Sequence, residues 1–483
     1  MGMYRAAYPG FSATRGNMIR IRKSIVATLT TFAAVAVIGV SVAHGGPGTA
    51  FNPPVKVTPD LGFGYEPATV ADGYGNIFVT AHKENWQLAL APDANSPTAT
   101  RSMSWVWTSV DGGQSFVDPP GLTGLSIEQH QFGDEGDLAF DDAHHLYFVD
   151  TNVADDTIAR WSVTGPGLAN MSLDFTRPLI PTAQPVDDRP WVTAHGNGHV
   201  FYLGNEGDKV TYPLGQGTGS GFGPGRYTVY RSTDGGQTFD PLGYTLKDSG
   251  WCRPAADHAP ASPYVYVVCG NDGGSNDVFT PNNPKGTLYA YVSSNDGVSF
   301  ERYVVGHYNS TDTTFSWPTV SVAPDGSIWA LYVDAQQTDN CGTDVFGNTT
   351  CDPVTNRLML YHSTNHGKTW SGKDITPGRG RYRYAWLAVS ADGSKLGIGT
   401  YYRPNDTADW RVYGAVFNPG QKPALTSLDQ ANPVAPASAE APGDLMGSYF
   451  NPDGTLDVVW TRDVLRLDGV ATLERDIYFA RSK

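Results

Sequence analysis

The octapeptide STDGGQTF at residues 232–239 is repeated along the chain, and this repeat decides the fold. Three further copies read SVDGGQSF at 109–116, SSNDGVSF at 293–300 and STNHGKTW at 363–370. In such a turn the Asp or Asn side chain can cap the backbone that follows it, Gly supplies a positive φ, and the final aromatic residue packs behind the turn. We therefore interpret the octapeptides as structural rather than catalytic.

A longer unit surrounds the octapeptides. It consists of a short apolar segment, a turn rich in Asp, Gly and Pro, and a β-branched and aromatic run, and its seven copies begin at Pro67, Gly136, Pro190, Pro254, Pro318, Ala385 and Leu445. Each unit supplies two strands, with a third strand ending at the octapeptide and a fourth after it, which is the blade of a β-propeller. We predict an all-β propeller of seven four-stranded blades, with six blades plus a flanking strand pair as the alternative.

The last unit offers only three strands before the C-terminus. The segment PPVKVTPD at residues 53–60 precedes the first unit and has the composition of a strand. An N-terminal strand placed in the last blade would close the ring and pair an edge that would otherwise be open. We therefore expect one propeller domain over residues 53–483, closed by its N-terminal strand.

The composition agrees with this fold and restricts the partners. The chain has 483 residues, of which 40% are hydrophobic and 17% charged, together with 55 Gly and 34 Pro. That balance excludes a disordered protein and fits many short strands joined by tight turns. The formal charge of −15 argues against nucleic acid or anionic lipid as a partner, because both are negatively charged.

The N-terminus predicts export. Arg20, Arg22 and Lys23 precede a long apolar run that ends in small residues near Ala43. This order is typical of a secretory signal peptide, here residues 1–43, with Met18 as a possible true start. The run is also long enough to be an uncleaved membrane anchor, which is the alternative. We expect a secreted, monomeric protein with no other membrane association.

The four cysteines form two local pairs in the sequence. Cys252 and Cys269 flank one predicted hairpin, and Cys341 and Cys351 bracket a short polar loop. Four cysteines allow three connectivities, and the hairpin favours two local disulfides, in agreement with export. A zinc site is the less favoured reading, because the His and Cys spacing fits no usual pattern of ligands.

The octapeptide is the Asp-box, and through it the chain resembles the sialidase superfamily of Asp-box propellers over residues 53–483. The resemblance implies a glycoside hydrolase that cleaves a glycan, such as a sialoside, at the central mouth of the propeller. Two alternatives stay open: a non-catalytic propeller that binds glycan or protein, and a propeller polysaccharide lyase with a Tyr or His82 as its base. A carbohydrate or glycoconjugate is the expected partner of the hydrolase.

The candidate site residues come from the face on which first strands begin and second strands end. Strand starts crowd around the axis of a propeller, so charged residues there influence one another. The candidate nucleophiles or bases are Tyr384, Glu66, Glu135 and Asp188, and the candidate substrate-binding residues are Arg189, Arg253, Arg383, Trp317 and Arg403. The alternative reading is that these charges form a structural ring of salt bridges that plugs the channel.

The segment from Tyr384 to Tyr402 resembles the part of the sialidases that carries the nucleophilic Tyr, which makes Tyr384 the nucleophile that the resemblance implies. The family has a Glu after the final Tyr, where this chain has Tyr402 or Arg403, and an Arg-Ile-Pro motif opening the first blade, where it has Glu66 and Pro67. In the family that Glu orients that Arg, so both halves of one interaction are replaced. Asp93 is a weak analogue of the acid/base Asp.

No cofactor or metal is expected from the sequence, and calcium is the one candidate ion. The acidic residues Asp134, Glu135, Asp137, Asp187 and Asp188 offer the oxygen ligands that calcium prefers. Alternation along a strand would scatter them, and no EF-hand loop is present. Solvated or salt-bridged carboxylates are the favoured reading.

Overall fold

The described part of the computed structural model consists of strands and one short 3-10 helix. The structure describes residues 48–58, 64–83, 103–122, 135–151, 156–179, 190–205, 227–247, 249–270, 285–309, 317–343, 349–439, 441–442, 445–465 and 473–483. The predicted signal peptide and its alternative, an anchor, lie outside these ranges. Within them, no helix has the length and apolar character needed to span a membrane.

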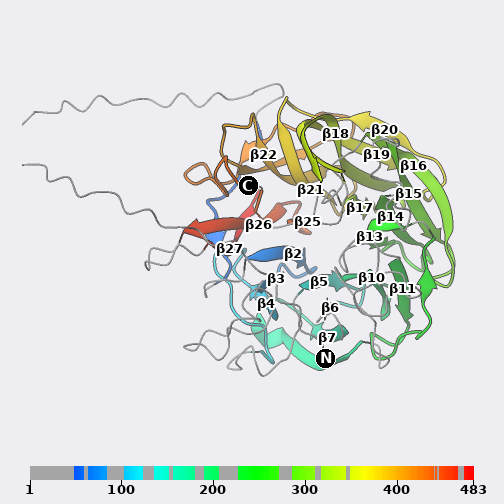
Figure 1. Ribbon diagram of the computed structural model, residues 1–483. Coiled ribbons are helices and arrows are strands. Elements are labelled where there is room, and N and C mark those ends of the chain that lie inside the picture. Colours follow the sequence, from blue (N-terminus) through cyan, green and yellow to red (C-terminus); the bar gives the residue numbers. More distant parts are fainter. Residues whose placement is uncertain are drawn as a thin grey trace, which may run out of the picture. The chain divides into compact units, whose positions relative to one another are not determined.

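Seven antiparallel sheets make up the unit from Ala43 to Lys483 and lie around one axis (Figure 1). Blade 1 contains β2 (Tyr65–Ala71), β3 (Ile77–Lys83) and β4 (Met103–Ser109); blade 2 contains β5 (Glu135–Phe140), β6 (His145–Thr151), β7 (Asp156–Val163) and β8 (Met171–Pro178); blade 3 contains β9 (Trp191–His195), β10 (His199–Asn205), β11 (Tyr227–Ser232) and β12 (Tyr244–Thr245). The 3-10 helix η2 (Leu168–Asn170) connects β7 to β8.

The remaining blades repeat this plan. Blade 4 contains β13 (Gly250–Ala256), β14 (Val265–Gly270), β15 (Lys285–Ser293) and β16 (Glu301–Asn309); blade 5 contains β17 (Thr319–Val322), β18 (Ile328–Thr343), β19 (Thr349–Ser363) and β20 (Ser371–Asp374); blade 6 contains β21 (Arg381–Val389), β22 (Leu396–Arg403), β23 (Arg411–Phe417) and β24 (Thr426–Ser427); blade 7 contains β25 (Gly447–Phe450), β26 (Leu456–Leu465), β27 (Leu473–Arg481) and β1 (Val55–Lys56). Six sheets thus have four strands. In blade 1 a two-residue bridge between Thr108 and Val117 stands in place of the fourth strand.

The N-terminal strand closes the ring. β1 pairs antiparallel with β27, with Val55 opposite Phe479, and Lys56 forms an ion pair with Asp476 at 3.0 Å. The first strands of successive blades contact one another in a closed cycle from β2 through β25 and back to β2. The predictions of seven blades and of closure by the segment at residues 53–60 are both confirmed.

The core lies between the faces of neighbouring blades, which explains the composition of the strands. β14 (VYVVCG) is buried at every position, because its sheet is covered on both faces by the sheets beside it. The fourth strand β8, at the outer edge, alternates buried or half-buried with exposed residues. Aromatic side chains fill much of the space between the blades, among them the fully buried Trp161, Trp410 and Trp460.

The Asp-box turns are held by their own side chains. In the box at 232–239 the Asp234 carboxylate accepts hydrogen bonds from the Thr238 backbone N–H at 2.9 Å, the Thr238 hydroxyl at 2.6 Å and the Ser232 hydroxyl at 2.8 Å. Burial alone would raise the pKa of Asp234, but these hydrogen bonds stabilise the charged form, and the net effect lowers its pKa. The structural role predicted for the octapeptides agrees with this geometry.

Replacement of Asp234 tests this role. Asn295 occupies the same box position in blade 4 and accepts the equivalent hydrogen bond from the Ser299 N–H at 3.0 Å, so we expect Asp234→Asn to lose less than about 1 kcal/mol at neutral pH. Asp234→Ala leaves the turn uncapped and should cost about 1–3 kcal/mol. Because the pKa of Asp234 is lower in the folded state, its contribution is present above a pH of about 4 and is lost as pH falls through the folded pKa. Urea unfolding of both variants at neutral and acid pH measures these differences; equal losses in the two variants at neutral pH would contradict the capping role.

One of the two predicted disulfides is present. Cys252 on β13 and Cys269 on β14 lie directly opposite each other in the hairpin, and their sulfur atoms are bonded at 2.05 Å. Cys341 and Cys351 lie on β18 and β19, which pair as one long hairpin. Their side chains lie outside the described part of the structure, so the second disulfide stays a prediction.

Candidate functional site

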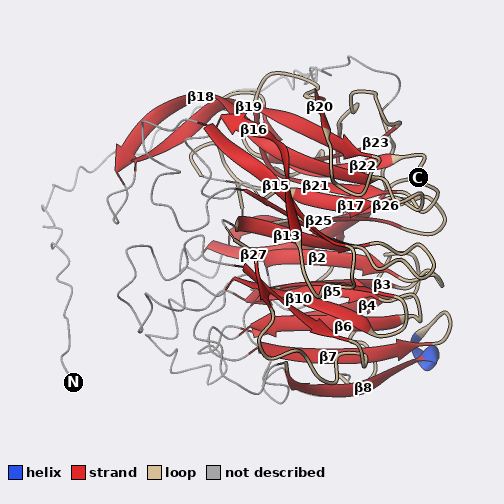
Figure 2. Ribbon diagram, turned by 90° about the vertical axis from the view of Figure 1, so that its right-hand side faces the viewer, coloured by secondary structure: helices blue, strands red, loops and turns tan. Residues whose placement is uncertain are grey.

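The two faces of the ring differ in which connections between strands they carry. The short turns that join first to second strands and third to fourth strands lie at the right-hand edge of Figure 2, where η2 also lies. We call this the turn face. The first strands begin at the opposite face, which we call the mouth face. Among the predicted site residues that the structure describes, Glu66, Trp317 and Tyr384 lie near the beginnings of these strands.

Three first strands carry, near their beginning, a non-glycine residue in the left-handed region. Glu66 on β2 has φ 49°, Trp251 on β13 has φ 50° and Tyr384 on β21 has φ 49°. Each lies in an irregular step of its strand, where the pairing with the second strand shifts register. A bulky residue held at positive φ costs about 1–3 kcal/mol and is concentrated at functional sites, so this shared strain singles out the three positions. We refer to Glu66, Trp251 and Tyr384 as the rim.

The rim positions are equivalent within their blades. Each lies two residues before the first residue of its strand that lines the axial channel, namely Ala68, Arg253 and Trp386. Trp317 stands in the same place relative to Thr319 of β17. Three of the predicted site residues, Glu66, Trp317 and Tyr384, therefore occupy corresponding positions around one opening.

Glu66 lies beside the imidazole of His82, and its neighbour Tyr65 forms a cation–π contact with Arg475. The Glu66 carboxylate is 3.6 Å from Nε2 of His82 at the end of β3, and both side chains are buried. The neighbouring Tyr65 ring lies under the Arg475 guanidinium at 4.3 Å. Arg475 in turn donates to Asp463 at 2.9 Å. Glu66 is thus a buried carboxylate at the mouth face with a group nearby that can take up or supply a proton.

Tyr384 packs against the second strand of its own blade. Its ring meets the Tyr401 ring edge to face, with centroids 6.0 Å apart, and 9% of the residue is exposed. The Tyr401 hydroxyl accepts a hydrogen bond from the Thr461 N–H at 2.8 Å, and burial raises the pKa of Tyr401. Tyr401 is therefore a neutral, hydrogen-bonded side chain against which the Tyr384 ring packs. Of these two tyrosines, Tyr384 is the one with a left-handed backbone.

Arg253 does not lie free at the mouth but inside a cluster that fills the axis. Its guanidinium donates to the Asp137 carboxylate at 3.1 Å and stacks between the rings of Trp191 at 3.9 Å and Trp386 at 4.4 Å. Burial raises the pKa of Asp137 and lowers that of Arg253, while their mutual attraction opposes both changes. We call Asp137, Trp191, Arg253 and Trp386 the axial plug. For Arg253 the plug matches the structural alternative raised from the sequence.

Two further tryptophans extend the plug toward the rim. Trp317 meets Trp191 edge to face at 5.3 Å and meets Trp251 in the same way at 4.7 Å. Trp317 and Trp251 are each at most 5% exposed. Trp317 therefore lies at the predicted opening as part of a packed aromatic layer.

Two other predicted arginines, Arg383 and Arg403, belong to blade 6. Arg403 donates to the Ala437 carbonyl at 2.9 Å and lies over the Trp410 ring at 4.5 Å, so it ties down the segment after β24. Asp406 lies 3.0 Å from Arg381 and 3.7 Å from Arg403. Arg383, which directly precedes Tyr384, is buried.

Several predicted residues cannot be compared with the structure. Asp188 and Arg189, the weak analogue Asp93, and Asp134 and Asp187 of the calcium hypothesis lie outside the described residues. Glu135 begins β5, but its side chain is not described. The calcium hypothesis is tested only at Asp137, which is engaged by Arg253 and by the Val192 N–H at 3.1 Å.

A cavity of about 640 Å³ occupies the axis below the plug. Its lining includes Asp137 and Arg253 at the level of the plug and reaches Asp142, His144 and His258 at the turns. The cavity belongs to the turn face, whereas Glu66 and Tyr384 do not line it. The mouth and this cavity are therefore separate features on either side of the plug.

Three tryptophans near the axis were missing from the sequence-based candidates. These are Trp191, Trp251 and Trp386, although a Trp recurs at or near the beginning of four first strands, in WVT, WCRP, WPT and AWLA. This recurrence was a signal that aromatic residues converge on the axis. Arg475 and Tyr65 lacked such a signal, because they meet only through the closure of blade 7 onto blade 1.

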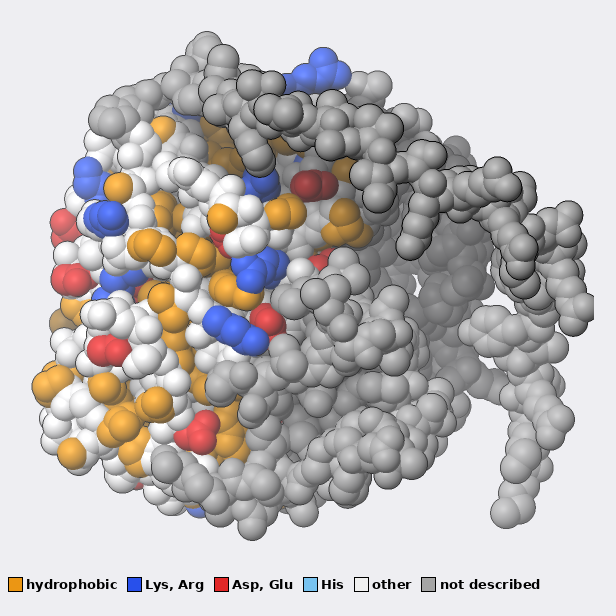
Figure 3. Space-filling view, turned by 90° about the vertical axis from the view of Figure 1, so that its left-hand side faces the viewer, with side chains coloured by type: hydrophobic (Ala, Val, Ile, Leu, Met, Phe, Trp, Pro, Cys, Tyr) orange, Lys and Arg blue, Asp and Glu red, His pale blue; other side chains and the backbone are white. Residues whose placement is uncertain are grey.

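The surface beside the ring closure carries mixed charge. Figure 3 shows acidic and basic side chains interspersed with apolar and neutral ones over the part of this side that the structure describes. Charges of both signs that lie so close together give no extended field of one sign.

Comparisons with known proteins show a likeness in architecture only. No protein-family model matches the chain, and no curated protein matches it in sequence. Solved structures that resemble it include a protein of unknown function from Dyadobacter fermentans (13% identity, TM-score 0.46, 90% of this chain and 100% of that one). Others are the GH93 α-L-arabinofuranosidase of Fusarium graminearum with arabinobiose (9%, 0.40, 88% and 97%) and the K499G mutant of NanB sialidase from Streptococcus pneumoniae (8%, 0.42, 91% and 71%). At these identities the activities of those proteins do not transfer to this chain.

Proposed function

We propose that this protein is a secreted glycoside hydrolase that cleaves a glycan at the mouth face, with Tyr384 as the nucleophile. The observation that supports this most directly is the shared left-handed conformation of Glu66 and Tyr384 at equivalent strand starts. Strain of this kind persists where the surrounding structure overdetermines it and is concentrated at active sites. The Asp-box resemblance supports the same class of reaction.

The proposed chemistry uses a Tyr and carboxylates. Tyr384 attacks the anomeric carbon while Glu66 takes its phenolic proton, and a covalent glycosyl-tyrosine forms as the glycosidic bond breaks. Glu135 or Asp188 gives a proton to the leaving oxygen, and water then releases the sugar from Tyr384. A Tyr nucleophile is a known exception to the two-carboxylate pattern of glycosidases. In this scheme Glu66 is the base that activates Tyr384.

The substrate is proposed to be an acidic glycan. Arg383 directly precedes the nucleophile, and Arg189 belongs to the same face in the sequence, so both are candidates for holding a carboxylate through the guanidinium fork. Arg253 is a poorer candidate, because Asp137 and two tryptophan rings already surround its guanidinium. Arg403 is likewise committed to the segment around Trp410.

A lyase is the second candidate, and one observation favours it. His82 lies 3.6 Å from Glu66 at the same rim, so an imidazole and a tyrosine would both be available to remove a proton next to a uronate carboxyl group. Such a reaction yields an unsaturated sugar instead of adding water. The two candidates therefore differ in their products.

A product analysis separates these readings. Purified protein is incubated with sialosides, uronic-acid polysaccharides and neutral glycosides, and free reducing ends and unsaturated products are measured separately. Reducing ends without unsaturation support the hydrolase, and unsaturation supports the lyase. If neither appears with any substrate while calorimetry detects glycan binding, the hydrolase proposal fails and the non-catalytic propeller replaces it.

Export is part of the proposal. The disulfide between Cys252 and Cys269 suits an oxidising compartment, and the apolar run before Ala43 suits a signal peptide. Mass spectrometry of protein recovered outside the cells would give the mature N-terminus. A product that retains its N-terminal apolar run in the membrane fraction would favour the anchor.

A further inference from the structure

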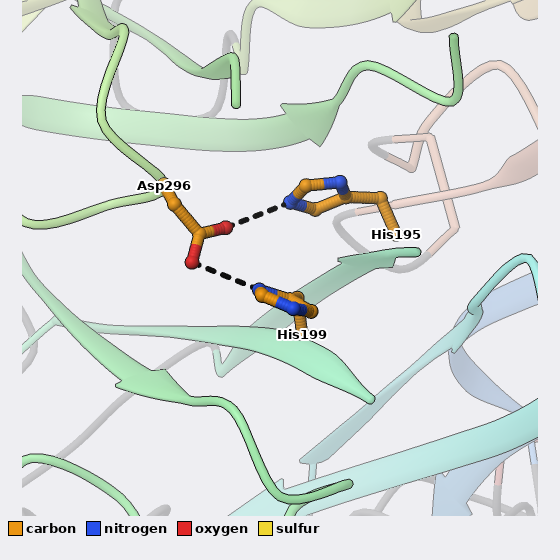
Figure 4. Close-up of side chains that lie close together, drawn as sticks. All are labelled: His195, His199 and Asp296. Atoms are coloured by element: carbon orange, nitrogen blue, oxygen red, sulfur yellow. Dashed lines mark hydrogen bonds and ion pairs between the residues drawn. The ribbon is translucent and has the colours of Figure 1, made fainter. Parts of the chain in front are cut away.

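A cluster of two histidines and one aspartate lies on the turn face, away from the proposed active site. His195 ends β9, His199 begins β10, and Asp296 lies in the Asp-box between β15 and β16. Figure 4 shows the carboxylate of Asp296 facing both imidazoles, with one oxygen directed at each ring. Blades 3 and 4 therefore both contribute to this cluster.

The distances in the cluster are close to those of a metal site. Nε2 of His195 is 3.0 Å from Oδ1 of Asp296, and Nδ1 of His199 is 2.8 Å from Oδ2. All three potential ligand atoms lie within 4.8 Å of one another, the single such group of three within the described ranges. Ligands at about 2.0–2.1 Å from a tetrahedral zinc ion are separated by about 3.3 Å, so the three ligand atoms would draw closer together around a bound ion.

The hairpin sequence HGNGH places the two imidazoles side by side. His195 and His199 are cross-strand partners, and their ring centroids are 5.3 Å apart. Gly196 and Gly198 in the turn have φ 60° and 84°, which are values that glycine adopts without steric cost. His195 is buried, whereas the His199 side chain is 36% exposed, so the cluster can be reached from solvent and His199 can adjust.

Asp296 occupies a position that favours glycine. The fourth residue of the Asp-box is left-handed in all four copies: Gly112 has φ 76°, Gly235 has φ 74°, Asp296 has φ 60° and His366 has φ 55°. The chain thus holds an aspartate at a conformation that costs a non-glycine residue free energy. The contacts of His366 with Tyr264 and Tyr266 offset this cost in its own box. The contacts of the Asp296 carboxylate must offset the same cost in the box of blade 4.

An ion pair accounts for only part of these contacts. Arg231 at the end of β11 donates to Oδ2 of Asp296 at 3.1 Å through Nε. Arg160 at the corresponding place in blade 2 donates to Asp174 of its own blade at 2.8 Å and to the carbonyl of Gly235 in blade 3 at 3.1 Å. An arginine can therefore join neighbouring blades without a carboxylate on the partner blade and without any histidine. The two imidazoles on Asp296 are therefore additional to the link between blades.

We propose that His195, His199 and Asp296 bind a divalent transition-metal ion of the zinc type, which fastens blade 3 to blade 4. Two imidazole nitrogens and one carboxylate oxygen are ligands that such ions prefer, and water completes the coordination. Arg231 then serves as the outer partner that orients the Asp296 carboxylate. The site is independent of the proposed hydrolase, because it lies on the other face and uses none of the rim residues.

Titration with metal alone tests the proposal. Full-length untagged protein is treated with chelator, dialysed and titrated with ZnCl₂ by calorimetry, and CoCl₂ is added in parallel to record visible absorption. We expect one equivalent of Zn²⁺ to bind, ligand-field bands from Co²⁺, and a rise in the melting temperature with Zn²⁺ concentration. No stoichiometric Zn²⁺ binding by the wild type would overturn the proposal.

Two variants and a matched control locate the site. Asp296→Gly restores the residue that two other boxes carry, so it should fold and still bind Zn²⁺ more than about 100-fold more weakly, as should His199→Gln. His145→Gln removes a histidine that pairs with Asp141 at 2.8 Å on the same face, and it should retain wild-type affinity. Equal affinity in the wild type, Asp296→Gly and His199→Gln would place the ion elsewhere and reject the assignment.

Discussion

Replacement of Tyr384 by Phe is expected to reduce glycoside hydrolysis by at least about 1000-fold, which corresponds to about 4 kcal/mol of transition-state stabilisation. The substitution removes only the hydroxyl that attacks the anomeric carbon. Phe keeps the ring that packs on Tyr401 and the same β-carbon at φ 49°, so the fold and the backbone strain should be retained. Steady-state kinetics on the substrate found active with the wild type measures the effect.

A tyrosine on the same strand provides the control. The hydroxyl of Tyr382 donates to the Gly378 carbonyl at 2.7 Å and so is engaged away from the rim. Tyr382→Phe should change stability slightly and leave kcat within about threefold of the wild type. Glu66→Gln should also lower kcat strongly and alter the acid limb of the pH profile, because it removes the proposed base. Wild-type kcat in Tyr384→Phe would eliminate the proposed nucleophile.

The blade architecture could be predicted from the sequence because it is a local repeat. The Asp-boxes and the two-strand units mark each blade in order, and the short final unit indicates that a strand from elsewhere must complete it. The pairing of Val55 with Phe479 and the bond between Cys252 and Cys269 follow from that register. Each of these features depends on which strand neighbours which, and the repeat specifies this.

The site could be predicted only in part, because its contacts cross the axis. The repeat places Arg253, Glu66 and Tyr384 on one face, but it does not indicate whether a side chain at that face points to solvent or into the axis. Arg253 meets Trp386 of blade 6 and Asp137 of blade 2, residues far from it in the sequence. The left-handed backbone of Glu66 and Tyr384 could not be predicted from the sequence either, because neither Glu nor Tyr is a residue type that favours a positive φ.

Removal of the Arg253 guanidinium should produce the largest loss of stability. Arg253→Met keeps an unbranched side chain between Trp191 and Trp386 but leaves the Asp137 carboxylate without its cation. Breaking a buried ion pair in this way costs about 3–5 kcal/mol, because a charge stays behind in an apolar environment. The double variant Arg253→Met with Asp137→Leu removes both charges and should recover most of the loss, which urea unfolding of the three proteins measures.

The loss should also depend on pH in a direction that identifies its cause. Burial already raises the pKa of Asp137 in the folded state, and without Arg253 that pKa must rise further. A carboxyl group with a raised folded pKa destabilises the fold as pH increases from its unfolded pKa, about 3.9, through its folded pKa. Arg253→Met should therefore be close to the double variant near pH 4 and fall below it toward pH 7. A difference between the two that stays constant over this range would mean that lost packing of the guanidinium on the tryptophans, rather than the unpaired carboxylate, limits stability.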